Sequence, residues 1–210
     1  MKKNTSSVRR TSSLELIHKL KAIQKPFYTL SDLEIVYAKG RNATKYAVNR
    51  AIKKQVLKRL APNIYVCPLF NYDIRLIANL FYYPSYLSFE SALSLYGILS
   101  QIPYTMMFAT TRRSKKTIID GYEIEYKKVK PTQFFGYKKK DQIYIADPEK
   151  ALLDCIYFVT IGKGRLNTNE LTLKGIDQKR LKDYSTRFPQ RTQVAVRKLY
   201  PLLNQVTATI

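Results

Sequence analysis

The residues best suited to chemistry in this sequence lie on one side of a helix that we expect over residues 42–55. At about 100° per residue, that side gathers Lys45, Tyr46, Asn49, Arg50 and Lys53. The other side gathers Ala47, Val48, Ala51, Ile52 and Gln55. Arginine can donate a bidentate pair of hydrogen bonds to guanine, asparagine can pair with adenine, and lysine can contact phosphates. A tyrosine can meet a phosphate or a thymine methyl group. We therefore interpret the polar side as a DNA-reading face.

Four further cations flank this face. Lys39 and Arg41 precede the expected helix, and Lys58 and Arg59 follow it in an expected strand. We expect all four to bracket the same groove of DNA. The alternative is that the polar side is the solvated side of an amphipathic helix, as most charge runs are. We favour DNA binding because the side carries no Asp or Glu and its surroundings are strongly basic.

One short motif points to an enzyme. Glu125-Tyr126-Lys127 matches half of a metal-dependent nuclease signature, in which carboxylates hold a divalent cation and lysine positions the attacking water. The upstream carboxylate is missing, because no acid lies between Glu90 and Asp120. The alternating pattern also explains Glu125 and Lys127 as the solvent side of a strand. We favour that second interpretation.

Other catalytic or metal-binding sets are not recognisable. Asp147 and Glu149 flank a proline in the order that begins a helix. His18 is the sole histidine, and Cys67 and Cys155 lack the spacing of metal ligands. The sequence also has no glycine-rich phosphate loop. We expect a protein that is not an enzyme, with no catalytic residue, no metal and no cofactor.

Three helices are expected around the DNA-reading face. Ser12 with Glu15 has the spacing of a capping box and marks the start of the first helix. Ser31 with Glu34 repeats that spacing and marks the second. Asn42 is expected to cap the third helix.

A hairpin is expected after these helices. Strand patterns cover residues 56–59 and 64–66, joined by a short turn that contains a proline. In the second helix, Leu30 before the cap and Ile35 after it have the arrangement of a hydrophobic staple. Three helices followed by a hairpin predict a winged helix-turn-helix.

The remainder of the chain is expected to mix helices and strands. The expected elements are helices over residues 74–81 and 88–95, strands over 105–111, 117–119, 122–126 and 143–146, and a helix from 147. Asp120-Gly121 is a strong hairpin turn, because a tight primed turn needs positive φ. Beyond Gly164 we expect further helix. The fold class is therefore α+β, an N-terminal winged helix-turn-helix followed by a mixed α/β C-terminal domain.

The charge is large and unevenly distributed. The 210 residues include 37 Lys and Arg against 15 Asp and Glu, for a formal net charge of +22. Residues 1–66 hold 15 of these cations and 3 of these acids. The charge indicates a polyanionic partner, nucleic acid first and an anionic membrane surface second. We favour double-stranded DNA and no membrane. The expected parts are a flexible basic arm over 1–11, the DNA-binding domain over 12–70 and the C-terminal domain over 71–210. We find no secretory signal and no membrane-spanning run, and expect a cytoplasmic protein.

The chain resembles the AbiEi-type antitoxins, which are transcriptional regulators of bacterial type IV toxin-antitoxin systems. Residues 29–66 look like the winged-helix domain of that family. Residues 84–99 are similar to its Ser-x-x-Ser-Ala-Leu…His-Gly-Leu segment, with Tyr96 where histidine is frequent. Residues 146–158 contain Ala-Asp-Pro-Glu-Lys-Ala-Leu-Leu-Asp, which is similar to a further family signature.

The resemblance implies an autorepressor that binds repeats in its own operator, with possible self-association on DNA. It also implies that the second domain counteracts a nucleotidyltransferase-like toxin, often without a stable complex. The antitoxin role rests on the resemblance alone. The alternatives are a stand-alone winged-helix repressor of a mobile element and a DNA-targeted metal-dependent nuclease.

Overall fold

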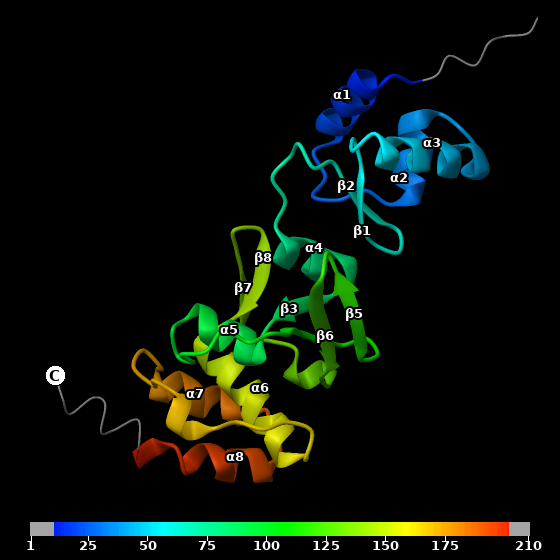
Figure 1. Cartoon of the computed structure of the whole chain (residues 1–210). Helices are drawn as coiled ribbons and strands as arrows, with labels where there is room; N and C mark the ends of the chain where they lie inside the picture. Colours follow the sequence, from blue (N-terminus) through cyan, green and yellow to red (C-terminus); the bar gives the residue numbers. More distant parts are fainter. Residues whose placement is uncertain (1–10, 202–210) are drawn as a thin grey trace, which may run out of the picture. The chain divides into compact units, whose positions relative to one another are not determined.

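The computed structural model describes residues 11–201 and divides them into two compact units after Asp73 (Figure 1). Both units contain helices and strands, so the α+β class expected from the sequence is confirmed. Residues 1–10 of the expected N-terminal arm lie outside the described residues.

The first unit contains three helices and a two-stranded hairpin. In chain order these are α1 (Ser13–Ile23), α2 (Leu30–Tyr37), α3 (Arg41–Lys53), β1 (Lys58–Ala61) and β2 (Ile64–Val66). The helices pack around an apolar core that includes Leu16, Leu20, Leu33, Val48 and Leu57. The order of elements is the one expected from the sequence.

The second helix starts earlier than expected. Thr29, not Ser31, is the N-cap, and its hydroxyl accepts a hydrogen bond from the Asp32 amide at 3.2 Å. The Asp32 carboxylate accepts in return from the Thr29 amide at 2.8 Å, which completes the capping box. Leu30 thereby becomes the first helical residue and is buried, whereas Ile35 is 79% exposed. The hydrophobic staple expected between Leu30 and Ile35 is therefore wrong.

The third helix also starts earlier than expected. Ala38 ends α2 in the left-handed conformation, with φ of 50°, and Gly40 occupies the N-cap of α3. Asn42, the expected cap, lies inside the first turn of α3. The Thr44 hydroxyl donates to the Lys39 carbonyl at 3.1 Å and closes this turn.

The hairpin joins the helices through hydrogen bonds. The amides of Val56 and Leu57 both donate back to the Ala51 carbonyl, which delays the first strand from the expected residue 56 to Lys58. Tyr28 and Tyr65 then exchange backbone hydrogen bonds of 2.7 and 2.9 Å. The segment before α2 is therefore hydrogen-bonded to β2.

The second unit is built on a six-stranded mixed sheet in the order β5-β6-β4-β3-β8-β7. The strands are β3 (Ser85–Leu87), β4 (Met106–Thr110), β5 (Lys115–Ile119), β6 (Tyr122–Lys128), β7 (Tyr137–Lys140) and β8 (Ile143–Ala146). The pairs β4–β6 and β3–β8 are parallel, and the others are antiparallel. The β5–β6 turn has positive φ at Asp120 and Gly121, as expected.

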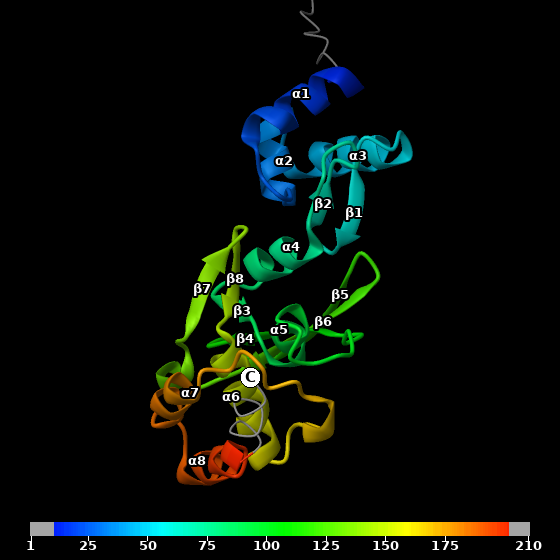
Figure 2. The same cartoon turned by 90° about the vertical axis from the view of Figure 1, so that its left-hand side faces the viewer.

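Helices cover both faces of this sheet (Figure 2). The helices of this unit are α4 (Ile74–Phe81), α5 (Phe89–Leu95), α6 (Pro148–Thr160), α7 (Gln178–Ser185) and α8 (Gln190–Arg197). Of these, α4, α5 and α6 pack on the sheet, whereas α7 and α8 pack mainly on α6. Tyr126 and Lys127 are neighbours on β6, so their side chains point to opposite faces. The Tyr126 hydroxyl donates to the carbonyl of Ala78 in α4 at 2.6 Å, whereas Lys127 lies over Phe89 of α5 and Phe158 of α6.

The helical tail expected beyond Gly164 is correct in part. Residues 161–177 contain turns and a short 3₁₀ helix, η2 (Thr168–Glu170), before α7 begins. A second 3₁₀ helix, η1 (Pro131–Gln133), lies between β6 and β7. Among residues 11–201, no helix has both the length and the apolar character needed to span a membrane.

Candidate nucleic-acid interface

The polar side of α3 faces solvent along its whole length. The exposed side chains are Lys45, Tyr46, Asn49, Arg50 and Lys53, with Tyr46 73% exposed. The buried side consists of Thr44, Ala47, Val48 and Ala51. The expected division of the helix into a packing side and an exposed side is therefore observed, and α3 contains no acid. Gln55, which was expected on the packing side, is a correction: α3 ends at Lys53, and Gln55 is exposed with φ of 59°.

Asn42 belongs to the same exposed side, although sequence reasoning placed it outside the helix. It lies in the first turn of α3, seven residues before Asn49, and is exposed. Residues at that spacing share one face of a helix. The signal was present in the spacing of Asn42, Asn49 and Lys53, but the assignment of Asn42 as a cap concealed it.

The cations before α3 have different surroundings. Arg41 is exposed and lies 3.6 Å from the carboxylate of Glu34, which is partly buried. Lys39 is partly buried and lines a hollow that α1 and α3 share. Arg41 is therefore paired at the α2–α3 turn, whereas Lys39 lines the hollow.

We call this concavity the α1–α3 hollow; it has a volume of about 270 Å³. Its cationic lining residues are Lys39, Arg50 and Lys54. Thr11, Ser12 and Ser13 contribute hydroxyl groups at the start of α1. Tyr37 also lines the hollow, and burial raises the pKa of Tyr37 to about 12, with the nearby Arg50 acting in the opposite direction. The tyrosine hydroxyl is therefore a neutral donor at pH 7.

The two cations of the hairpin make contacts within the first unit. The Lys58 ammonium lies 3.3 Å from the Tyr72 hydroxyl, and the Arg59 Nε donates to the Ala61 carbonyl at 3.4 Å. Both side chains are exposed. They supply positive charge on the hairpin, next in the chain to α3.

No family model and no curated protein matches this chain. The interface is therefore assessed from its own residues.

The nuclease-like pair on β6 is engaged in packing and pairing. Glu125 lies 3.7 Å from Lys116 on the adjacent strand, and the Lys127 ammonium lies 4.8 Å from the centre of the Phe89 ring. Among residues 11–201, no cluster of three His, Cys, Asp or Glu side chains could hold a metal ion. Cys155 is buried, and burial raises the pKa of its thiol well above the usual value.

A buried polar cluster lies between β3 and α6. Asp154 accepts hydrogen bonds from the hydroxyls of Ser88 at 2.7 Å and Tyr86 at 3.1 Å. Its other oxygen pairs with Lys150, one turn earlier on α6. All four side chains are buried, so this cluster is an internal support of the sheet.

Two of the three segments that carry the resemblance to the AbiEi-type antitoxins meet in this unit. Ser88 comes from residues 84–99, and Asp154 comes from residues 146–158. Tyr96, where the family frequently has histidine, donates its hydroxyl to the Ala146 carbonyl at 3.0 Å. These contacts join β3 and the start of α5 to the middle of α6, and the end of α5 to the end of β8.

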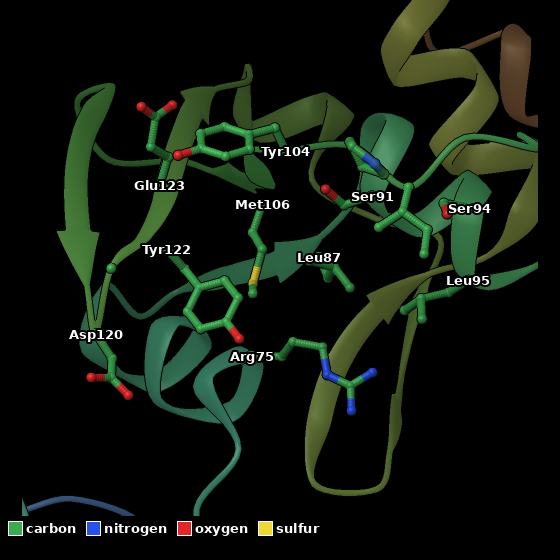
Figure 3. A pocket seen from close by; sticks show the side chains of 13 residues that line it. Arg75, Leu87, Ser91, Ser94, Leu95, Tyr104, Met106, Asp120, Tyr122 and Glu123 are labelled. Atoms are coloured by element: carbon green, nitrogen blue, oxygen red, sulfur yellow. The ribbon is translucent and has the colours of Figure 1, made fainter.

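A second hollow, of about 920 Å³, lies in the second unit (Figure 3). Its lining is mainly apolar and includes Leu87, Leu95, Tyr104, Met106 and Tyr122. A hollow with this lining suits an apolar or aromatic group.

Proposed function

We propose that the first unit is a winged helix-turn-helix domain that binds DNA through α3, and that the protein represses transcription from its own operator. The observation that carries this proposal is the exposed, acid-free side of α3, where Asn42, Asn49 and Lys53 lie together. Amide and cationic side chains on one helix face are the groups that read base edges and phosphates in a major groove.

The surroundings of α3 support the same proposal. Helix α2 precedes α3 across a short turn, as in a helix-turn-helix, and the β1–β2 hairpin follows as a wing would. The hairpin adds the exposed cations Lys58 and Arg59. The strong excess of positive charge in residues 1–66 favours a polyanion as the partner.

We further propose that the protein is an antitoxin that counteracts a nucleotidyltransferase-like toxin and is not itself an enzyme. This part rests on the resemblance to the AbiEi-type antitoxins. Two of the resembling segments contribute Ser88, Lys150 and Asp154 to one buried cluster, which is a packing feature of the second unit. The second unit would then provide neutralisation, with no stable complex required.

The DNA-binding proposal is tested with the full chain, a duplex from its own promoter and a scrambled duplex, over a salt series. We expect a preference for the promoter that persists at moderate salt. A triple variant, Asn49→Ala with Arg50→Ala and Lys53→Ala, should lose that preference. Lys179→Ala with Lys182→Ala, which removes two exposed charges from α7, is the charge-matched control and should keep it.

Two results would contradict the proposal. If the wild type bound both duplexes with the same affinity and the same salt dependence, the interaction would be a general attraction between a basic protein and a polyanion. Unchanged promoter affinity in the triple variant would remove α3 from the interface. The antitoxin proposal has its own test, rescue of growth when the protein is produced together with the adjacent toxin, and a failure to rescue would leave a repressor alone.

A further inference from the structure

The α1–α3 hollow has the composition of an anion site. Lys39, Arg50 and Lys54 place three cationic side chains around about 270 Å³. None of these three side chains has a hydrogen bond or an ion pair within residues 11–201. No Asp or Glu lines the hollow, so its charge is not neutralised from within.

A tyrosine hydroxyl lies beside these cations. Tyr37 lines the hollow and is only 7% exposed as a whole residue. Its hydroxyl oxygen is not among the buried side-chain atoms that lack a hydrogen bond in the described residues, which belong to Glu34, Glu90 and Glu149, so the hydroxyl opens to solvent. Because this tyrosine stays protonated at neutral pH, it can donate to an anionic oxygen.

The start of α1 adds further donors to the same place. Ser12 caps the helix by accepting from the Glu15 amide at 3.1 Å, and Ser13 begins the helix. The first amides of an 11-residue helix carry the positive end of its dipole. The hydroxyls of Thr11 and Ser13 can also donate to a bound oxygen.

The residues of α3 that line the hollow lie on a different side of the helix from Asn49 and Lys53. Ala47, Arg50, Ala51 and Lys54 line it at spacings of three and four residues, which is one stripe of the helix. Asn49 and Lys53 lie on the neighbouring exposed stripe, away from the hollow. Arg50 therefore lies at the edge of the exposed side of α3, toward α1.

We infer that the α1–α3 hollow binds a phosphate group, and that Arg50 and Lys54 contact the DNA backbone while Asn49 faces the bases. This inference rests on the proposed function for its source of phosphate, since a duplex backbone and free phosphate share the same chemistry. A tetrahedral dianion or diester fits several donors that converge from different elements. It also revises the role of Arg50, which the sequence alone allowed to pair with guanine.

The first arm of the test uses the full chain with promoter and scrambled duplexes over a salt series. Arg50→Ala and Lys54→Ala should each lower the affinity for both duplexes by the same factor, about tenfold. Each should also reduce the slope of log affinity against log salt concentration by about 1. Asn49→Ala is the matched control on the neighbouring stripe of α3, and it should lower the affinity for the promoter duplex alone. The inference would be overturned if Arg50→Ala lowered the affinity for the promoter duplex and left the affinity for the scrambled duplex unchanged.

The second arm uses inorganic phosphate in place of DNA. The melting temperature of the full chain should be higher in sodium phosphate than in sodium chloride of equal ionic strength, because an anion that binds the folded state stabilises it. Arg50→Ala and Lys54→Ala should lose this difference, and Lys53→Ala, an exposed lysine outside the hollow, should keep it. Equal melting temperatures in the two salts for the wild type would overturn the inference.

The two arms separate the two proposals. A rise in melting temperature with phosphate that depends on Arg50 and Lys54, together with no duplex binding, would support the anion site and contradict the DNA-binding proposal. Promoter binding that depends on Asn49, together with no effect of phosphate on the melting temperature, would support the DNA-binding proposal and contradict the hollow as a phosphate site.

Discussion

Asp154 shows how single side chains hold the second unit together. It lies at the end of the Ala-Asp-Pro-Glu-Lys-Ala-Leu-Leu-Asp run and accepts from Ser88, Tyr86 and Lys150 in the buried space between β3 and α6. Burial lowers the pKa of Lys150, and the carboxylate of Asp154 acts against that shift. The aromatic rings of Tyr86, Phe135 and Phe188 surround the lysine ammonium at 5.2 to 5.4 Å. The free-energy cost of burying each charge is therefore offset only while the other charge is present.

Asp154→Ala should destabilise the protein by about 3–5 kcal/mol, because it leaves a buried ammonium without its carboxylate. Adding Lys150→Met to that variant should recover part of the loss, since the unpaired charge is then removed. Urea denaturation followed by circular dichroism measures both. Equal or greater destabilisation in the double variant would show that the pair itself, and not the unpaired charge, dominates.

The residues of the candidate interface could be predicted in part. The exposed side of α3 follows from helical spacing alone, which is why Lys45, Asn49 and Arg50 were recognisable in the sequence. Tyr37 and Lys54 were not, because their importance comes from a hollow formed by residues of two helices that are far apart in sequence. Tertiary packing, which spacing does not report, brings these residues together.

The start of α2 shows the same limit at the level of an element. Thr29 with Asp32 and Ser31 with Glu34 both have capping-box character, and local sequence does not choose between them. The choice is made by the hairpin, since the Asn63 side chain accepts from the Leu30 amide at 2.8 Å. The side chain of Leu30 is buried at the same time.

Asp32→Ala should destabilise the first unit by about 1 kcal/mol at pH 7, because the capping box loses its second half. Burial acts to raise the pKa of Asp32, but hydrogen bonds from Lys25 and Thr29 outweigh it and the pKa is lowered. A carboxylate with a lowered folded-state pKa stabilises the fold above its unfolded pKa, about 3.9, and this contribution is lost as pH falls through the folded value.

The difference in unfolding free energy between wild type and Asp32→Ala should therefore shrink as the pH is lowered from 7 to about 3. Chemical denaturation at a series of pH values measures this difference. Ser31→Ala is the matched control, because Ser31 is exposed and is not the cap. A larger loss in Ser31→Ala than in Asp32→Ala would contradict the capping seen here.

Elements of the second unit were predictable where the signal is local. The Asp120-Gly121 turn and the start of α6 before Pro148 follow from residue types that favour particular backbone angles. The strand order was not predictable, because β4 pairs with β6 and β3 with β8 across intervening segments. Pairing of that kind depends on packing against α4 and α6.

At the scale of the whole molecule, the two units have separate cores. The buried cluster of the first unit runs from Leu16 to Cys67 and draws on all three of its helices. The second unit is organised around its own sheet, with α6 almost wholly buried against it. A unit with its own core can fold alone.

A fragment of residues 1–73 should therefore fold by itself, with helical circular dichroism and a cooperative thermal transition. It should keep the preference for the promoter duplex over the scrambled one, because the proposed DNA contacts all lie within it. The complementary fragment, residues 74–210, should fold and show no such preference. An unfolded first fragment would show that the cores depend on one another.

The outer strands of the six-stranded sheet carry rows of lysine. Within the described sheet, β5 and β7 are the edges, with Lys115 and Lys116 on one and residues 138–140 on the other. An exposed strand edge is a template for pairing with another chain, and like charges that face each other oppose such pairing. Part of the +22 charge therefore opposes aggregation. Replacing the exposed Lys139 and Lys140 with threonine, which keeps the Lys138–Asp147 ion pair, should leave the fold intact and make concentrated protein prone to assemble edge to edge.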